Sequence, residues 1–175
     1  PGTIVQGERR RAGGASGRGR PLTRGLTAAA VSKKLTADDV RQSLSAQVAA
    51  RGAEIFEKYG PRPGWNELLR LLEDRGCVRY PCTVAFDAGP LQAGECAWPK
   101  PKGDRPEDGF VICIHPVFMT QLDRAAHLAL YQLVVVNYGE FATAEDAEIF
   151  GAAALGMSRE QYYEGLCEMA DLIGE

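Results

Sequence analysis

The sequence of 175 residues has no hydrophobic run long enough to cross a membrane. Its longest apolar stretch, residues 128–136, is interrupted by Tyr131 and Gln132 and falls far short of the ~20 residues that a membrane-spanning helix needs. The chain also lacks the Gly-Lys-Ser/Thr ending of a phosphate-binding loop, the G-x-S-x-G turn of serine hydrolases and the kinase motifs. We therefore expect a soluble protein without a membrane partner or a nucleotide-binding fold.

Cysteine is present, but no pair has the C-x-x-C spacing. The five cysteines are Cys77, Cys82, Cys96, Cys113 and Cys167. An odd number without that spacing argues against the disulfide framework of a secreted domain and against a tetrahedral zinc knuckle. The composition therefore favours a reducing, cytoplasmic setting.

Charge is divided unevenly along the chain. The first 34 residues hold eight basic side chains and one acid, a net charge of +7, whereas the remaining 141 residues hold twelve basic and 22 acidic side chains, a net charge of −10. The eight are Arg9, Arg10, Arg11, Arg18, Arg20, Arg24, Lys33 and Lys34. Because residues 7–25 are mainly glycine, arginine and serine, they have little apolar surface to offset the entropy of ordering. We predict a basic arm at residues 1–34, disordered or ordered only on a partner, and a single domain at residues 35–175.

Helical periodicity occupies both ends of that domain. Apolar spacing predicts helices over residues 36–58, 65–75, 122–136, 144–154 and 159–173. Three of these segments begin with the spacing of a capping box, at Thr36, Thr143 and Ser158. The segment 122–136 is apolar almost all round, which is typical of a helix buried at the centre of a domain.

Alternating apolar and polar residues predict three short strands between the helices. These are residues 82–87, 93–98 and 110–115, with a proline-rich loop at residues 99–109. An antiparallel meander is the most economical arrangement of three consecutive strands. The fold class that follows is α+β: a small antiparallel three-stranded sheet packed by N-terminal and C-terminal helices, with the basic arm extended at the N-terminus.

Three polar side chains lie along one stripe of the predicted central helix. Asp123, His127 and Tyr131 have the spacing i, i+4, i+8, so a carboxylate could orient an imidazole with a phenol nearby. Such a row can support acid–base chemistry or a metal. The more ordinary interpretation is a core histidine and an acid placed favourably in the first turn of a helix.

A metal site is the second possible use of these residues. His115 ends the third predicted strand, and a regular meander places it one strand away from Glu95 and Cys96. Imidazole, carboxylate and sulfur ligands suit many transition metals. The candidate ligands are His115, His127, Asp123 and Glu95. Because no pair of them has a recognised ligand spacing, the first expectation is no cofactor, with a transition metal as the alternative.

The central helix also resembles one in a known enzyme family. Residues 127–131, His-Leu-Ala-Leu-Tyr, follow a strand and have the length of the H-E-x-x-H motif of zincin-type metallopeptidases. Leu128 stands at the position of the general-base Glu, and Tyr131 stands at that of the second histidine ligand. The resemblance covers only this helix and the strands before it, and it implies a related layout without the base that activates water.

Together these features favour a non-enzymatic interaction or assembly protein whose basic arm docks on an acidic protein partner or on a sister subunit. Residues 115–175 offer such an acidic surface, with ten acids against Arg124 and Arg159. One alternative is a small metal-dependent hydrolase of degenerate zincin-like layout. A second is a nucleic-acid accessory factor that binds phosphates through the arm, although the arm lacks the aromatic residues of many single-strand binders.

Overall fold

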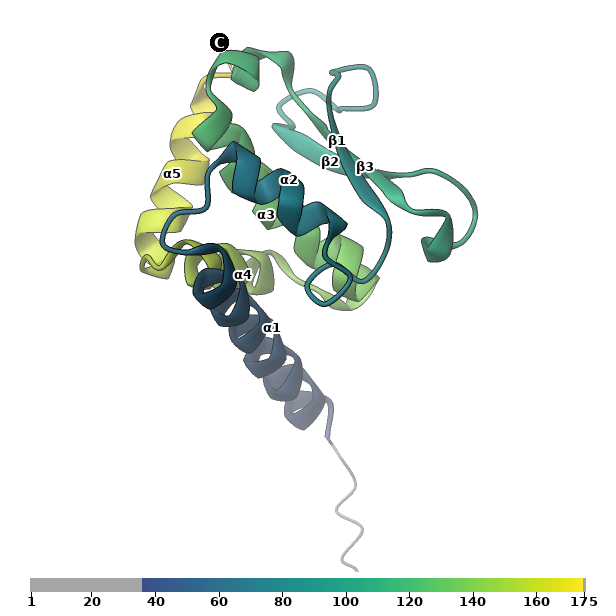
Figure 1. Cartoon of the computed structure of the whole chain (residues 1–175), viewed down its shortest axis with the longest axis vertical. Helices are drawn as coiled ribbons and strands as arrows, with labels where there is room; N and C mark the ends of the chain where they lie inside the picture. The colour runs from purple at the N-terminus through teal and green to yellow at the C-terminus, as the bar shows by residue number, and fades with distance from the viewer. Residues whose placement is uncertain (1–35, 175) are drawn as a thin grey trace, which may run out of the picture. The chain divides into compact units, whose positions relative to one another are not determined.

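The computed structural model of the protein describes residues 36–174. This part of the chain folds into five α-helices, three short 3₁₀ helices and a three-stranded sheet (Figure 1). The α-helices are α1 (Ala37–Tyr59), α2 (Trp65–Glu73), α3 (Leu122–Tyr138), α4 (Ala144–Leu155) and α5 (Arg159–Asp171). The strands are β1 (Cys82–Phe86), β2 (Ala97–Pro101) and β3 (Phe110–Ile114), and the 3₁₀ helices are η1 (Pro106–Asp108), η2 (Pro116–Thr120) and η3 (Gly139–Phe141). The α+β class is confirmed, and the predicted arm lies outside the described residues.

The helix boundaries follow their capping residues. Thr36, Thr143 and Ser158 each accept a hydrogen bond from the backbone N–H three residues later, and the side chain found there accepts one from the N–H of the cap. α1, α4 and α5 therefore begin where the capping boxes predict. α3 runs two residues beyond its predicted end and stops at Gly139, whose φ of 63° is unfavourable for a residue with a side chain.

The sheet is mixed, and the predicted antiparallel meander is wrong. β3 lies in the centre, parallel to β1 and antiparallel to β2. β1 and β2 are therefore the two edges and do not pair with each other. Alternation predicts that a strand exists but not which strand it pairs with, and consecutive strands are neighbours in only about two-thirds of cases.

β2 begins four residues later than predicted and includes part of the segment predicted to be a loop. Its prolines, Pro99 and Pro101, argued against a strand because they have no backbone N–H. Alternate residues of a strand direct their N–H groups to opposite edges, and the N–H of Lys102 bonds the carbonyl of Gly109 on the β3 side. The two prolines thus fall on the outer edge, where no ladder hydrogen bond is required and where proline discourages pairing with another chain.

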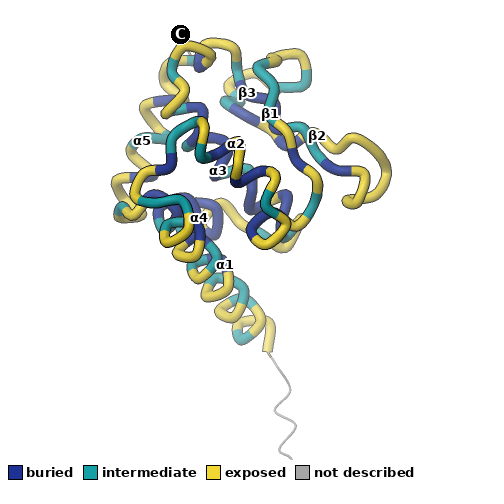
Figure 2. Tube along the Cα trace, viewed as in Figure 1, coloured by how far each residue is buried: buried dark blue, intermediate teal, exposed yellow. Residues whose placement is uncertain are grey.

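α3 lies between the sheet and the other helices. It contacts β2 and β3 as well as α2, α4 and α5. Ala125, Ala129 and Leu133 are fully buried, and Figure 2 shows buried residues along most of this helix. The central position predicted from its apolar sequence is thus confirmed. Among the helices of residues 36–174, none combines the length and apolar character that a bilayer crossing requires.

α1 packs closely along α4. At Gly52, an added Cβ would lie 2.6 Å from the backbone oxygen of Phe150 and 2.7 Å from the Cβ of Ala153. Because real Cβ atoms do not approach other atoms so closely, only glycine permits this separation of the two helices.

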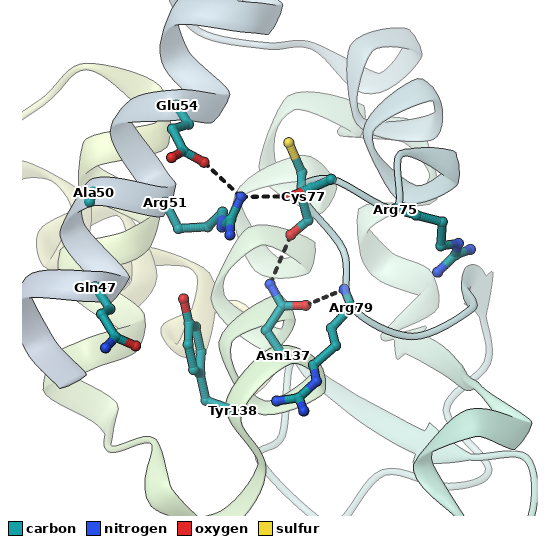
Figure 3. Close-up of a pocket in the computed structure, with 10 residues that line it drawn as sticks. Gln47, Ala50, Arg51, Glu54, Arg75, Cys77, Arg79, Asn137 and Tyr138 are labelled. Carbon is teal, nitrogen blue, oxygen red and sulfur yellow. Dashed lines mark hydrogen bonds and ion pairs between the residues drawn. The ribbon is translucent and has the colours of Figure 1, made fainter. Parts of the chain in front are cut away.

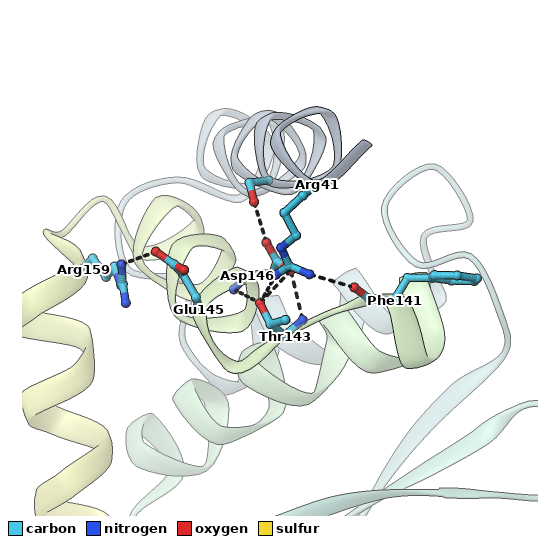
Figure 4. A network of polar contacts seen from close by, with 7 residues as sticks. Arg41, Phe141, Thr143, Glu145, Asp146 and Arg159 are labelled. Atoms are coloured by element: carbon cyan, nitrogen blue, oxygen red, sulfur yellow. Dashed lines mark hydrogen bonds and ion pairs between the residues drawn. The ribbon is translucent and has the colours of Figure 1, made fainter. Parts of the chain in front are cut away.

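A buried carboxylate joins the beginning of α1 to the beginning of α4 (Figure 4). Asp146 is 0% exposed and accepts hydrogen bonds from the backbone N–H of Thr143 at 2.9 Å, from Ser45 Oγ at 2.8 Å and from the Arg41 guanidinium at 2.9 Å. Burial alone would raise the pKa of Asp146, but these hydrogen bonds and the charge of Arg41 outweigh it and leave the pKa below its ordinary value. The negative charge is therefore fully paired within the fold.

Candidate functional site

The basic arm, which carries the sequence-based proposal for binding, lies outside the described residues. Its candidate binding residues, Arg9, Arg10, Arg11, Arg18, Arg20, Arg24, Lys33 and Lys34, therefore stay a prediction. The nucleic-acid alternative depends on the same residues and stays a prediction as well.

α5 carries a row of acids on its outer face. The row, called the acidic stripe below, consists of Glu160, Glu164, Glu168 and Asp171, all exposed. Tyr162 and Met169, on the inner face of the same helix, are buried. Neighbouring acids of the stripe are three or four residues apart, so their carboxylates share one helix face and repel each other. Within residues 36–174, Arg124 is the one basic side chain within 4.0 Å of the stripe, with its Nη2 3.5 Å from Glu168 Oε2.

The row predicted on α3 is not joined by hydrogen bonds within the described structure. Asp123 is exposed, whereas His127 and Tyr131 are half-buried. The His127 ring centroid lies 6.0 Å from that of Tyr162, whose hydroxyl donates to the backbone oxygen of His127 at 2.7 Å. Burial lowers the pKa of His127, and the charge of Asp123 opposes this only in part. These contacts are those of a packed, neutral histidine, which is the more ordinary of the two interpretations.

His115 lies beside Cys96 across the sheet, as the sequence predicted. The backbone N–H of His115 donates to the oxygen of Cys96 at 2.8 Å. Its Nδ1 accepts a hydrogen bond from the N–H of Val117 at 3.3 Å and so caps η2. Glu95 Oε2 accepts from the N–H of Gln92 at 2.8 Å within a tight turn. Both side chains thus support local backbone structure.

The four candidate metal ligands do not come together in the described structure. Across residues 36–174, no group of three or more His, Cys, Asp or Glu side chains is placed to hold a metal ion, and this range includes His115, His127, Asp123 and Glu95. The metal-dependent hydrolase of zincin-like layout therefore stays a prediction, without support from the geometry of these residues.

The cysteines are in their thiol form and are not paired with one another. Burial raises the pKa of Cys77 and of Cys82 to about 11, and it also raises the pKa values of Cys96 and Cys113. Thiols with raised pKa values are protonated at neutral pH and are poor nucleophiles. These four side chains therefore act as small apolar groups of the interior.

A groove, which the sequence analysis missed, lies between α1, the segment after α2 and the C-terminal end of α3 (Figure 3). It consists of two adjoining hollows of about 450 and 440 Å³. Gln47, Arg79 and Tyr138 line both hollows, so the groove is continuous. The polar end is lined by Arg51, Arg75 and Asn137 and also by Glu54, which bonds Arg51. The apolar end is lined by Val40, Leu44 and Phe141 and also by Asp39 and Arg41, whose charges are engaged by the cap of α1 and by Asp146.

Asn137 holds the backbone at the polar end of the groove in place. Its side-chain amide donates to the oxygen of Cys77 at 3.0 Å and accepts from the N–H of Arg79 at 2.8 Å. The segment that carries Arg79 is thus attached to α3, nearly sixty residues away in sequence. Sequence periodicity cannot reveal such a contact, because it describes the residues of one element and not which distant segment packs against them.

Comparisons with family models, curated proteins and solved structures find no match to this chain. Its function is therefore inferred from the charge and geometry of its own residues.

Proposed function

We propose that the protein is a non-enzymatic interaction and assembly protein whose basic N-terminal arm docks on the acidic stripe of a sister subunit. The observation that carries the proposal is that, in residues 36–174, only Glu168 of the stripe has a basic side chain within 4.0 Å, namely Arg124. Glu160, Glu164 and Asp171 have no basic side chain within 4.0 Å among residues 36–174. Residues 1–34, with a net charge of +7, have the opposite sign and several arginines with which to reach these carboxylates.

Helix energetics support the same proposal. Like charges three or four residues apart destabilise a helix by about 0.2–0.5 kcal/mol per pair, so further cations beside Glu164 and Asp171 would relieve repulsion within the stripe. Each exposed arginine–carboxylate pair contributes only about 0–1 kcal/mol. Binding therefore requires several arginines to act together, and it should weaken strongly when salt screens them.

A sister subunit is favoured over a different acidic protein because every copy of the chain carries both the arm and the stripe. In a dimer with twofold symmetry, docking of each arm on the stripe of the other copy would form the same contact twice. The second contact is then intramolecular and needs no further loss of translational freedom.

Sedimentation velocity of the full chain tests this proposal. We expect a dimer at low ionic strength and a monomer at about 1 M salt, where the screening length falls to about 3 Å. Replacing three acids of the stripe (Glu160→Lys, Glu164→Lys, Asp171→Lys) should leave a monomer at all salt concentrations. Replacing the six arginines of the arm by glutamine should do the same.

A matched control changes three exposed acids outside α5, namely Glu57→Lys, Glu73→Lys and Glu107→Lys. The control has the same net charge as the stripe variant and should still dimerise. Equal dimerisation of the stripe variant and the wild type would contradict the proposal. A wild-type chain that is monomeric at low ionic strength would exclude the sister subunit as the partner of the arm.

A further inference from the structure

We infer that the groove beside α1 is a docking site for an acidic amphipathic segment of another protein. The inference is independent of the arm, because it depends on a different surface and on charges of the opposite sign.

The apolar end of the groove exposes large side chains within a concave surface. Val40 is 56% exposed and Phe141 is 80% exposed, and both line the same hollow with the half-buried Leu44 and Tyr138. Apolar side chains that gather in a hollow, rather than being scattered singly, are typical of binding surfaces. A ligand with apolar side chains would remove this surface from water.

The polar end of the groove presents positive charge that the described fold leaves unpaired. Arg79 is exposed, with its guanidinium carbon 5.3 Å from the centroid of the Tyr80 ring, and no carboxylate lies within 4.0 Å of it among residues 36–174. Arg75 is likewise exposed without such a carboxylate, and its nearest bonds are long ones to backbone oxygens.

Arg51, at the same end, has a structural role instead. Its Nη1 bonds Glu54 Oε2 at 2.6 Å and the backbone oxygen of Gly76 at 2.6 Å, as Figure 3 shows. The side chain of Arg75 points away from the other labelled residues in Figure 3, toward backbone oxygens at the end of α2. Arg79 is therefore the cation at the groove that is open to an external carboxylate.

These two ends together select the class of ligand. A small anion or a nucleic acid would pair with Arg79 but would leave Val40 and Phe141 in water, and a basic segment would be repelled by the same arginine. An acidic segment with apolar side chains satisfies both ends. Val40 and Arg51 are eleven residues apart on α1, about 16 Å at 1.5 Å per residue, which a helix of about three turns can cover.

A synthetic peptide provides the test with the full-length arm variant, in which the six arginines of residues 1–34 are replaced by glutamine so that the arm does not compete for the acidic probe. This variant, whose groove is unchanged, is the parent protein for the groove substitutions. The probe has about 14 residues, with leucine at positions i, i+3, i+4 and i+7 and glutamate at the others. We expect it to bind with a dissociation constant of about 100 μM or tighter, and to shift the backbone amide NMR signals of Gln47, Arg79 and Tyr138. Arg79→Glu and Phe141→Ser should each weaken binding at least about tenfold. The control Lys100→Glu makes the same charge change on β2 and should alter affinity by less than about twofold.

Four results would overturn the inference. They are absence of binding at about 1 mM peptide, equal binding by Arg79→Glu and by the parent protein, equal binding by Phe141→Ser and by the parent protein, and equal binding of a peptide in which lysine replaces glutamate. Sedimentation of the chain without peptide provides a fifth. If Phe141→Ser alone converted a self-associated chain to monomers, the groove would belong to a second copy and not to a partner protein. Because Phe141 and Arg79 are exposed, both variants should keep the wild-type circular dichroism spectrum.

Discussion

Asp146 and Arg79 are both charged side chains near α1, but they differ in burial and in their partners. Asp146 is fully buried and accepts hydrogen bonds from both helices that it joins. Arg79 is exposed, and the described structure gives it no carboxylate. Removing one partner of a charge that is paired inside the fold costs stability, whereas a charge without a carboxylate partner at a concave surface is available for binding. The predictions below test this division.

The largest effect should come from Asp146→Ala. The substitution removes the acceptor for Arg41, Ser45 and the backbone N–H of Thr143 in one step. We expect the free energy of unfolding to fall by about 3 kcal/mol, measured by urea denaturation. The matched control is Glu145→Ala, which removes an exposed acid from the same helical turn and should cost less than about 1 kcal/mol. Similar losses for both variants would mean that the buried charge does not join the helices.

Gly52→Ala should have the next largest effect. The added methyl group meets the backbone of α4, which cannot move aside as a flexible side chain would, so we expect a loss of about 1–3 kcal/mol. Gly165→Ala in α5 is the control because nothing lies within 4 Å of its added Cβ. It should stabilise the protein by about 0.5–1 kcal/mol through helix propensity. A stabilised Gly52→Ala would show that α1 and α4 are less closely packed than described.

The third prediction concerns the pH dependence of stability that the partly buried His127 side chain causes. Burial holds its folded-state pKa below the ordinary value of 6.5, so the unfolded chain binds this proton more readily. Its contribution to stability is therefore present above the unfolded pKa of about 6.5 and is lost as the pH falls through the lower folded-state pKa. His127→Gln should flatten the dependence of the unfolding free energy on pH across this range. An unchanged slope would assign the dependence to other groups.

Arg79→Glu should have the smallest effect on folding. Because no carboxylate of residues 36–174 lies within 4.0 Å of its guanidinium and its contact with the Tyr80 ring is at an exposed site, we expect the free energy of unfolding to fall by no more than about 1 kcal/mol. The same variant should lose binding to the acidic peptide. A loss of stability close to that of Asp146→Ala would contradict the claim that the charge of Arg79, unlike that of Asp146, is not needed for folding.

Local features of the fold could be predicted from sequence, because the physics involved is local. The capping boxes that begin at Thr36, Thr143 and Ser158 each span only four consecutive residues, and they are enough to predict where three helices start. The uniformly apolar sequence of residues 122–136 is enough to predict that this helix lies at the centre of the domain. A capping box or an apolar run does not depend on which element packs beside it.

Pairings between distant segments could not be predicted in this way. The order of the strands depends on the path of the chain from β1 to β2 and not on alternation, and the two prolines of β2 are acceptable only because that strand lies at an edge. The capping box that begins at Thr143 predicts only a local contact for Asp146, whereas the contact of Asp146 with Arg41 joins residues 105 positions apart. The groove has the same origin, since its walls come from three separate stretches of sequence.

Mixing two variants tests the central claim, that oppositely charged parts of two copies hold them together. The arm variant, with its six arginines changed to glutamine, keeps an intact acidic stripe, and the stripe variant keeps an intact arm. We expect each variant alone to sediment as a monomer at low ionic strength, and the equimolar mixture to contain a 1:1 complex that dissociates in about 1 M salt. A mixture that stays monomeric while the wild type dimerises would contradict the claim.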